Sequence, residues 1–215
     1  MRVVIAGGHG KIALHLERLL ARRGDEAVGL VRNPDHVEDL ERAGAQAVVL
    51  DLEHSAVEDV VPAIDGADAV VFAAGAGPGS GAERKHTVDR DAAILLADTA
   101  LATGVRRYVM VSSMRADQAD PDSDEVFQVY LRAKAAADAY VRDQDLDWTI
   151  VRPGGLTDDP PTGQVRLADG LEYGKIPRAD VAAVLLGVLD DAATAGKQFD
   201  LVAGSTPVKS ALTDV

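Results

Sequence analysis

Short apolar runs alternate with amphipathic segments along most of the chain, a pattern that predicts alternating strands and helices. The runs that we expect as strands span residues 2–6, 27–31, 47–50, 69–72, 107–111 and 148–151. The segments that we expect as helices span residues 11–23, 35–43, 57–63, 83–103 and 124–143. In the first of these helices, one face carries Ile12, Leu16, Leu19 and Leu20 at helical spacing. The early strands are apolar throughout instead of alternating, which is typical of parallel strands covered on both faces.

Repeated strand–helix units joined by right-handed crossovers predict an α/β fold with a doubly wound parallel sheet, the Rossmann fold. We expect the strand order 3-2-1-4-5-6 with one further strand, and helices on both faces. The pattern changes after Arg152, where a loop precedes a short strand at 165–167, a helix at 178–190 and a final strand at 198–202. Residues 1–215 are therefore expected to form a single domain, with 153–215 as a small cap on the substrate side.

Composition and charge narrow the class of protein. Apolar residues make up 47% of the chain and aromatic residues only 4%, so Ala, Val and Leu must fill the core. No apolar run reaches the ~20 residues that span a bilayer, and the strand-like start does not resemble a secretory leader. We expect a cytoplasmic, non-secreted protein. The net charge of −13 disfavours nucleic acid and anionic membranes as partners.

Metal and thiol chemistry are disfavoured by the residue types present. The chain has no cysteine, which excludes disulfides, thiolate catalysis and cysteine-bound metals. Its five histidines are scattered and form no HxxH or HExxH spacing. We therefore expect no metal site; the alternative is a Mg²⁺ ion held by carboxylates alone.

A glycine-rich segment joins the first predicted strand to the first predicted helix. It reads Gly-Gly-His-Gly-Lys-Ile-Ala and fits the pattern G-x-x-G-x-x-A. Its first glycine allows a tight turn, the third lets the backbone approach a pyrophosphate, and the helix start directs free N–H groups at the phosphates. The alternative is a tight connection without a ligand, and the histidine either contacts a phosphate or faces solvent. The cofactor contacts predicted here are Gly7, Gly8, His9, Gly10, Lys11 and Ile12.

The end of the second predicted strand bears on the choice of dinucleotide. NAD sites place a carboxylate about 20 residues past the glycines, on the ribose 2′-hydroxyl. Arg32 stands at this position, and a guanidinium there suits a 2′-phosphate. We therefore expect NADP as the cofactor and favour it over NAD; the alternative is a solvated surface arginine.

Six motifs in order resemble the short-chain dehydrogenase/reductase superfamily, most closely its small, atypical, epimerase-like and NmrA-like NAD(P)-binding members. They are the segment 7–13, Asp51-Leu52, Ala73-Ala74-Gly75, Val111-Ser112-Ser113, the YxxxK motif 130–134, and Val151-Arg152-Pro153-Gly154. The resemblance covers essentially the whole chain. It implies that Asp51 and Leu52 lie at the adenine ring. It also implies cofactor contacts for Ala73, Ala74, Gly75, Lys134 and Pro153.

The same resemblance implies a catalytic group. Tyr130 matches the acid/base of the family, Lys134 its partner, and Ser113 the serine that binds the substrate oxygen, with Ser112 as a second choice. The spacing i, i+4 supports the pair independently, because it puts an ammonium beside a phenol on one helix face. We expect the cation to lower the tyrosine pKa toward neutrality. The alternative is an ordinary amphipathic helix.

Two departures from the family pattern leave the activity open. Asp89 stands where fuller members carry a catalytic-helix asparagine, so either it replaces that residue or it is only a helix carboxylate. The chain also lacks a sizeable substrate domain. We expect an NADP(H)-dependent oxidoreductase acting on a small carbonyl, quinone or flavin-like substrate, as a monomer or homodimer. The alternatives are a non-catalytic NADP-binding redox sensor of the NmrA-like kind and a sugar epimerase/dehydratase.

Overall fold

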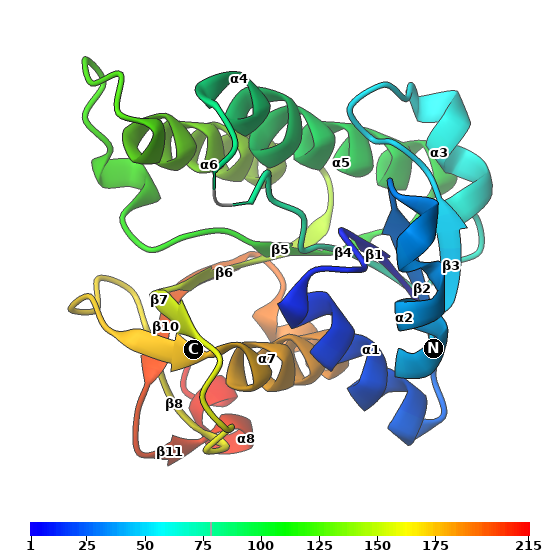
Figure 1. Cartoon of the computed structure of the whole chain (residues 1–215). Coiled ribbons are helices and arrows are strands. Elements are labelled where there is room, and N and C mark those ends of the chain that lie inside the picture. The colour runs from blue at the N-terminus through cyan, green and yellow to red at the C-terminus, as the bar shows by residue number, and fades with distance from the viewer. Residues whose placement is uncertain (78) are drawn as a thin grey trace.

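The computed structural model describes residues 1–77 and 79–215, which form a sheet between two layers of helices (Figure 1). Among these residues the main sheet has the order β11-β8-β10-β6-β5-β4-β1-β2-β3. Its parallel strands are β1 (Arg2–Ala6), β2 (Glu26–Val31), β3 (Gln46–Val49), β4 (Ala69–Phe72), β5 (Arg107–Val111), β6 (Asp147–Pro153) and β10 (Lys197–Ala203). Its antiparallel edge consists of β8 (Gln164–Ala168) and β11 (Thr206–Pro207).

Helices cover both faces of the sheet. One layer contains α1 (Lys11–Arg23), α2 (Val37–Ala43), α7 (Arg178–Asp190) and α8 (Val208–Leu212). The other contains α3 (Val57–Ile64), α4 (Ala82–Arg84), the π-helical segment η2 (Lys85–Asp91), α5 (Ala92–Thr103) and α6 (Val126–Arg142). Short 3₁₀ turns are η1 (Pro34–His36), η3 (Ala116–Gln118) and η4 (Ala192–Thr194). None of the described helices is long and apolar enough to cross a membrane.

The strands bury both of their faces, which explains their continuous apolar runs. In β1, Val3 and Ile5 pack into the core beneath α1 and α7, whereas Val4 and Ala6 pack into the core beneath α5. Successive side chains of a strand point to opposite faces, so a strand between two helical layers needs apolar residues at every position. The predicted parallel, doubly wound sheet is confirmed.

The predicted strand order 3-2-1-4-5-6 is also confirmed, and β10, parallel to β6, continues it. The expected short strand at 165–167 is β8, which lies antiparallel at the edge of the sheet together with β11. Residues 153–215 thus supply sheet strands and the helix α7, while β7 (Gly155–Thr157) and β9 (Lys175–Pro177) form a separate pair. The segment expected as one helix over 83–103 contains η2, and π-helical insertions are frequent at functional sites.

Candidate active site

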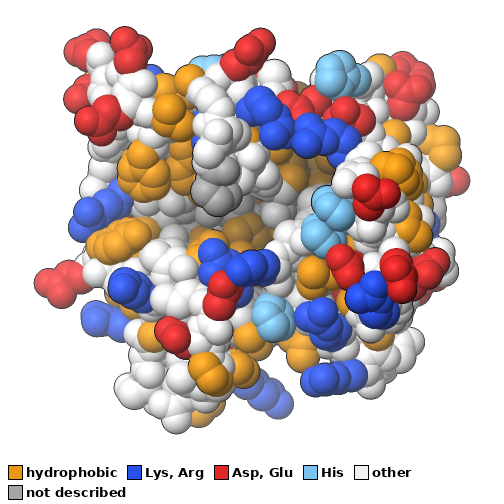
Figure 2. All heavy atoms as spheres, in the orientation of Figure 1, with side chains coloured by type: hydrophobic (Ala, Val, Ile, Leu, Met, Phe, Trp, Pro, Cys, Tyr) orange, Lys and Arg blue, Asp and Glu red, His pale blue; other side chains and the backbone are white. Residues whose placement is uncertain are grey.

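Two cavities lie at the carboxyl ends of the central strands, where ligands bind in sheets of this kind. The first has a volume of 390 Å³ and is lined by the glycine turn, the end of β2 and the segment after β3. The second has a volume of 560 Å³ and is lined by parts of η2 and α6. Both share Ala73, Ala74 and Gly75 after β4, so they adjoin. Figure 2 shows this face hollowed near its centre, between basic and histidine side chains on one side and hydrophobic ones on the other.

The glycine turn brings the backbone of β1 close to its neighbours. Gly7 has φ +81°, and a Cβ there would lie 2.6 Å from the Cα of Ala74. A Cβ on Gly8 would lie 2.8 Å from the Cα of Gly29. Helix α1 starts directly afterwards with Gly10 as its N-cap and no side-chain cap hydrogen bond. The N-terminus of this thirteen-residue helix therefore has free N–H groups and a partial positive charge, which can bind an anion. The pyrophosphate of a dinucleotide is an anion that fits this position.

The other residues of the glycine turn make contacts in different parts of the structure. The Nε2 of His9 lies 2.8 Å from Oδ2 of Asp39, and its ring stacks on His36 at a centroid distance of 3.5 Å. Lys11 forms an ion pair with Asp158, away from both cavities. Ile12 lines the second cavity. Gly8 contacts β2 and lines neither cavity, so its role here is close packing.

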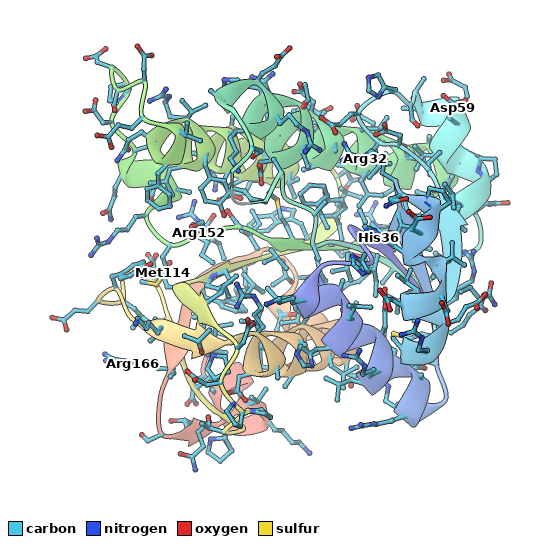
Figure 3. The ribbon with its side chains drawn as sticks, viewed as in Figure 1. Arg32, His36, Asp59, Met114, Arg152 and Arg166 are labelled. Carbon is cyan, nitrogen blue, oxygen red and sulfur yellow. The ribbon has the colours of Figure 1, made fainter. Side chains whose placement is uncertain are left out.

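Arg32 lies in the first cavity, but it is paired. Its Nη1 lies 2.7 Å from Oε2 of Glu53, which also contacts Arg84 at 2.6 Å and accepts a hydrogen bond from Thr87 at 2.6 Å. The hydrogen bonds from Arg84 and Thr87 and the nearby guanidinium charges lower the pKa of Glu53 to about 2. The loop after β3 thus brings a carboxylate to the arginine at the end of β2. Figure 3 shows Arg32 near His36 of the same cavity.

Asp51, Leu52 and the shared segment after β4 also line the first cavity. Pro153 does not line either one; it is buried at the end of β6, where its carbonyl accepts a hydrogen bond from the Met114 amide at 3.1 Å. The structure therefore brings together most of the residues predicted at the cofactor, and leaves Pro153, Gly8 and Lys11 outside the cavity walls.

The predicted pair on α6 lies in the second cavity. Tyr130 is half-buried, and Lys134, one turn later, is 3% exposed. The Lys134 ammonium donates to the carbonyls of Val111 at 3.2 Å and Ala74 at 3.4 Å, and lies 3.5 Å from Oδ1 of Asp89. It therefore ties α6 to the ends of β4 and β5 and to η2.

The expected lowering of the Tyr130 pKa is wrong for this state of the protein. Burial and the carboxylate of Asp89 raise the pKa of Tyr130 above its ordinary value, while Ser113 acts in the opposite direction. Burial also lowers the pKa of Lys134, against the pull of Asp89. The charge of Lys134 is largely matched by Asp89, so the phenol experiences a carboxylate as well as an ammonium.

Asp89 is a partner of Lys134 and not a solvated helix carboxylate. It is fully buried within η2, and its Oδ2 accepts a hydrogen bond from the Ala76 amide at 3.2 Å. Its Oδ1 has no hydrogen-bond partner among the described residues and lies 3.1 Å from where a Cβ on Gly75 would stand. Apart from the Lys134 ammonium at 3.5 Å, this buried oxygen has no donor near it among the described residues, and its position beside the segment shared by the cavities fits a bound polar ligand there.

The sequence interpretation missed several residues of the cavities. Lys85 is buried, donates to the Gly77 carbonyl at 2.9 Å and lies 5.5 Å from the centre of the Tyr130 ring. That ring therefore has two ammonium groups near it, since Lys134 lies 6.0 Å from its centre. Glu53 and Arg84 were missed in the first cavity. The spacing of Lys85, one turn before Asp89, was the one local pattern that could have indicated these residues. The contacts of Glu53 and Arg84 join segments that are far apart in the sequence, so spacing does not reveal them.

Serine and arginine side chains beside the site have structural partners. The Ser112 hydroxyl donates to the buried Asp138 at 2.9 Å, and Arg152 contacts the same carboxylate at 2.8 Å. Arg152 is 4% exposed, and Figure 3 shows it beneath α6. Arg152 is therefore held in a structural ion pair, and Ser113 is the serine near Tyr130.

The fold and the glycine turn define a dinucleotide-binding protein of the Rossmann class. Residues 7–192 match the family model described as NAD(P)H-binding, so the chain belongs to this family of NAD(P)-binding, oxidoreductase- and epimerase-like proteins. The expected family resemblance is confirmed at this level.

Relatives span the full length of the chain. It is 37% identical to the "Uncharacterized sugar epimerase YhfK" of Bacillus subtilis, over 99% of each chain. A solved Bacillus halodurans structure, provisionally assigned as an NAD-dependent epimerase/dehydratase, is 36% identical with a TM-score of 0.91 over 100% of both chains. The oxidoreductase ylbE from Lactococcus lactis has a TM-score of 0.88 at 24% identity, covering 100% of this chain and 96% of its own, a likeness that concerns the fold alone.

Proposed function

We propose that this protein is an NADP(H)-dependent oxidoreductase that reduces a small carbonyl, quinone or flavin-like substrate, with Tyr130 as the acid. The observation that carries the proposal is the half-buried phenol of Tyr130 beside two ammonium groups, in a cavity that adjoins the glycine turn. Dinucleotide and substrate would thus meet at Ala73–Gly75, which line both cavities.

The residues present fit a dinucleotide. The glycine turn and the start of α1 would hold the pyrophosphate, Asp51 and Leu52 the adenine end, and Arg32 a 2′-phosphate. Lys134 and Asp89 would face the nicotinamide ribose. When bound, the cofactor supplies the hydride that the reduction needs.

The protein itself would supply the proton for the reduction, from the phenol oxygen of Tyr130. A raised pKa keeps the Tyr130 phenol protonated at neutral pH, which is the form that donates to a substrate oxygen. Lys85 and Lys134 would then stabilise the phenolate that remains. Ser113 would hold the same substrate oxygen. This arrangement favours the direction of reduction.

The mouth of the second cavity favours a planar, conjugated substrate. Val126, Phe127 and Leu156 line it and are 44%, 59% and 38% exposed. The ring of Phe127 stacks on Tyr130 at a centroid distance of 5.9 Å. Exposed apolar and aromatic side chains at the mouth suit the face of a quinone or flavin ring, whereas the polar groups of the cavity lie around Tyr130.

The decisive experiment replaces Tyr130 with Phe and follows NADPH oxidation against a panel of quinones, flavins and aldehydes. Turnover should fall about 10²-fold or more, as expected for loss of a general acid, while calorimetric NADP⁺ affinity stays the same. Tyr140→Phe is the matched control, because Tyr140 lies on the same helix and its hydroxyl contacts Asp98 at 2.6 Å. Equal turnover in Tyr130→Phe and the wild type would remove Tyr130 from the mechanism.

A non-catalytic redox sensor is the second candidate. It is favoured by Asp89, which stands where the related enzymes carry a catalytic asparagine and whose negative charge offsets that of Lys134. Tight binding of NADP⁺ and NADPH without turnover of any panel member would support the sensor. A sugar epimerase/dehydratase is the third candidate, and calorimetric binding of a UDP- or dTDP-sugar would support it.

A further inference from the structure

Two segments of the chain meet around the carboxylate of Glu53, which lies in the loop after β3. Arg32 comes from the end of β2, and Arg84 and Thr87 come from the continuous stretch of α4 and η2. The Glu53 side chain is 12% exposed, whereas those of Arg32 and Arg84 are 54% and 38% exposed. The two guanidinium groups therefore reach the open part of the first cavity, and the carboxylate lies behind them.

The carboxylate uses donors that a phosphate would also need. Glu53 engages both Nε and Nη2 of Arg84 and Nη1 of Arg32, and its remaining contact is the Thr87 hydroxyl. A phosphate monoester is recognised by the same forked donors, with bidentate geometry. A second anion brought to these arginines meets both the occupied donors and the charge of Glu53.

We propose that Glu53 competes with the ribose 2′-phosphate for Arg32 and Arg84, and so sets the preference between NADP and NAD. This inference rests on the proposed dinucleotide function. It assigns Arg84, together with Arg32, to the 2′-phosphate. A 2′-hydroxyl can donate to Glu53 without disturbing either arginine, whereas a 2′-phosphate must draw the guanidinium groups away from it.

The test uses ligands that report on this end of the site alone. Calorimetry measures the binding of 2′,5′-ADP and of ADP, which differ in the 2′-phosphate, to the wild type and to Glu53→Gln. The variant keeps the shape of the side chain and removes its charge. It should bind 2′,5′-ADP about tenfold more tightly or better, and ADP no more tightly than the wild type does.

Two further variants separate charge competition from simple loss of structure. Arg84→Met should weaken the binding of 2′,5′-ADP by about tenfold and change the affinity for ADP by less than about twofold. Glu58→Gln removes the same charge from an exposed position of α3 outside the cavity and should change neither affinity. If Glu53→Gln fails to fold, as thermal denaturation would reveal, Glu53→Asp provides the test. It withdraws the carboxylate from Arg32 and Arg84 by one methylene, so it should also strengthen the binding of 2′,5′-ADP relative to that of ADP.

The outcomes distinguish this inference from the proposed function. If Glu53→Gln binds 2′,5′-ADP and ADP in the wild-type ratio, or weakens both, Glu53 only positions the arginines and the inference is wrong. If the wild type and Glu53→Gln bind ADP but neither binds 2′,5′-ADP, the NADP assignment fails and the inference fails with it. If neither nucleotide binds the wild type, the dinucleotide function itself fails.

Discussion

Glu17 is a carboxyl group buried in the floor of the glycine turn. It lies on α1, is fully buried, and neither of its oxygens has a hydrogen-bond partner among the described residues. Its Oε1 lies 3.1 Å from where a Cβ on Gly8 would stand and 2.7 Å from the equivalent point on Gly29. Burial raises the pKa of Glu17 to about 8, and Arg18 opposes this only in part.

The raised pKa makes folding stability depend on pH in a definite direction. In the unfolded chain the carboxyl loses its proton near the ordinary glutamate pKa of 4.5, whereas the folded protein retains it up to about pH 8. The stability contributed by this proton is therefore complete below pH 4.5 and is lost progressively as the pH rises to about 8. The difference of about 3.5 between the two pKa values corresponds to about 5 kcal/mol, at about 1.36 kcal/mol per pH unit. That is a large part of the roughly 5–15 kcal/mol typical of a folded domain.

Glu17→Gln should remove this dependence. The carboxamide has the same shape, stays neutral at every pH, and leaves the same polar atoms buried, so near pH 5 the two proteins should have similar stability. Between pH 5 and pH 9 the wild type should lose about 4 kcal/mol relative to the variant. Urea denaturation at intervals of half a pH unit, followed by circular dichroism, measures the difference in the free energy of unfolding.

Subtracting the two curves cancels every other titrating group. Glu41→Gln, an exposed glutamate of α2, is the matched control and should run parallel to the wild type. If the curves of Glu17→Gln and the wild type are parallel from pH 5 to pH 9, the Glu17 carboxyl is hydrated or ionised in the folded state. The reasoning from burial would then be refuted.

Three further predictions concern the site and its supports. Asp89→Asn removes the carboxylate that raises the pKa of Tyr130, so the pH above which kcat/KM for NADPH oxidation falls should move down; an unchanged profile would contradict this. Gly7→Ala places a Cβ 2.6 Å from the backbone after β4 at φ +81° and should cost about 1–3 kcal/mol in urea denaturation and weaken NADP⁺ binding in calorimetry. Asp138→Ala removes the buried partner of Arg152 and leaves its guanidinium only the exposed carboxylate of Asp117, at 3.3 Å. It should lower the unfolding free energy by about 3–5 kcal/mol; a loss below about 1 kcal/mol would show that Asp117 or water is enough to compensate the charge.

Local patterns in the sequence were sufficient to predict the parallel sheet and to locate the glycine turn and the YxxxK pair of the candidate site. Continuous apolar strands between amphipathic helices predicted the parallel order, because a strand between two helical layers must be apolar at every position. The glycine turn and the YxxxK pair were also found, since each lies within one or two turns of chain. These features depend on neighbours in sequence, which spacing alone records.

The tertiary structure decided the charge that each site residue experiences. Arg32, which the sequence predicts at a 2′-phosphate, lines the first cavity, but Glu53, which is paired with it, comes from another loop. Lys134 was identified as the partner of Tyr130, but the buried Asp89 helps to reverse the expected direction of the tyrosine pKa. Electrostatic effects act through space and strengthen with burial, so their sum at a site depends on which segments the fold brings together. The sequence by itself determined where a glycine turn and a phenol would stand, and only the fold determined which charges surround them.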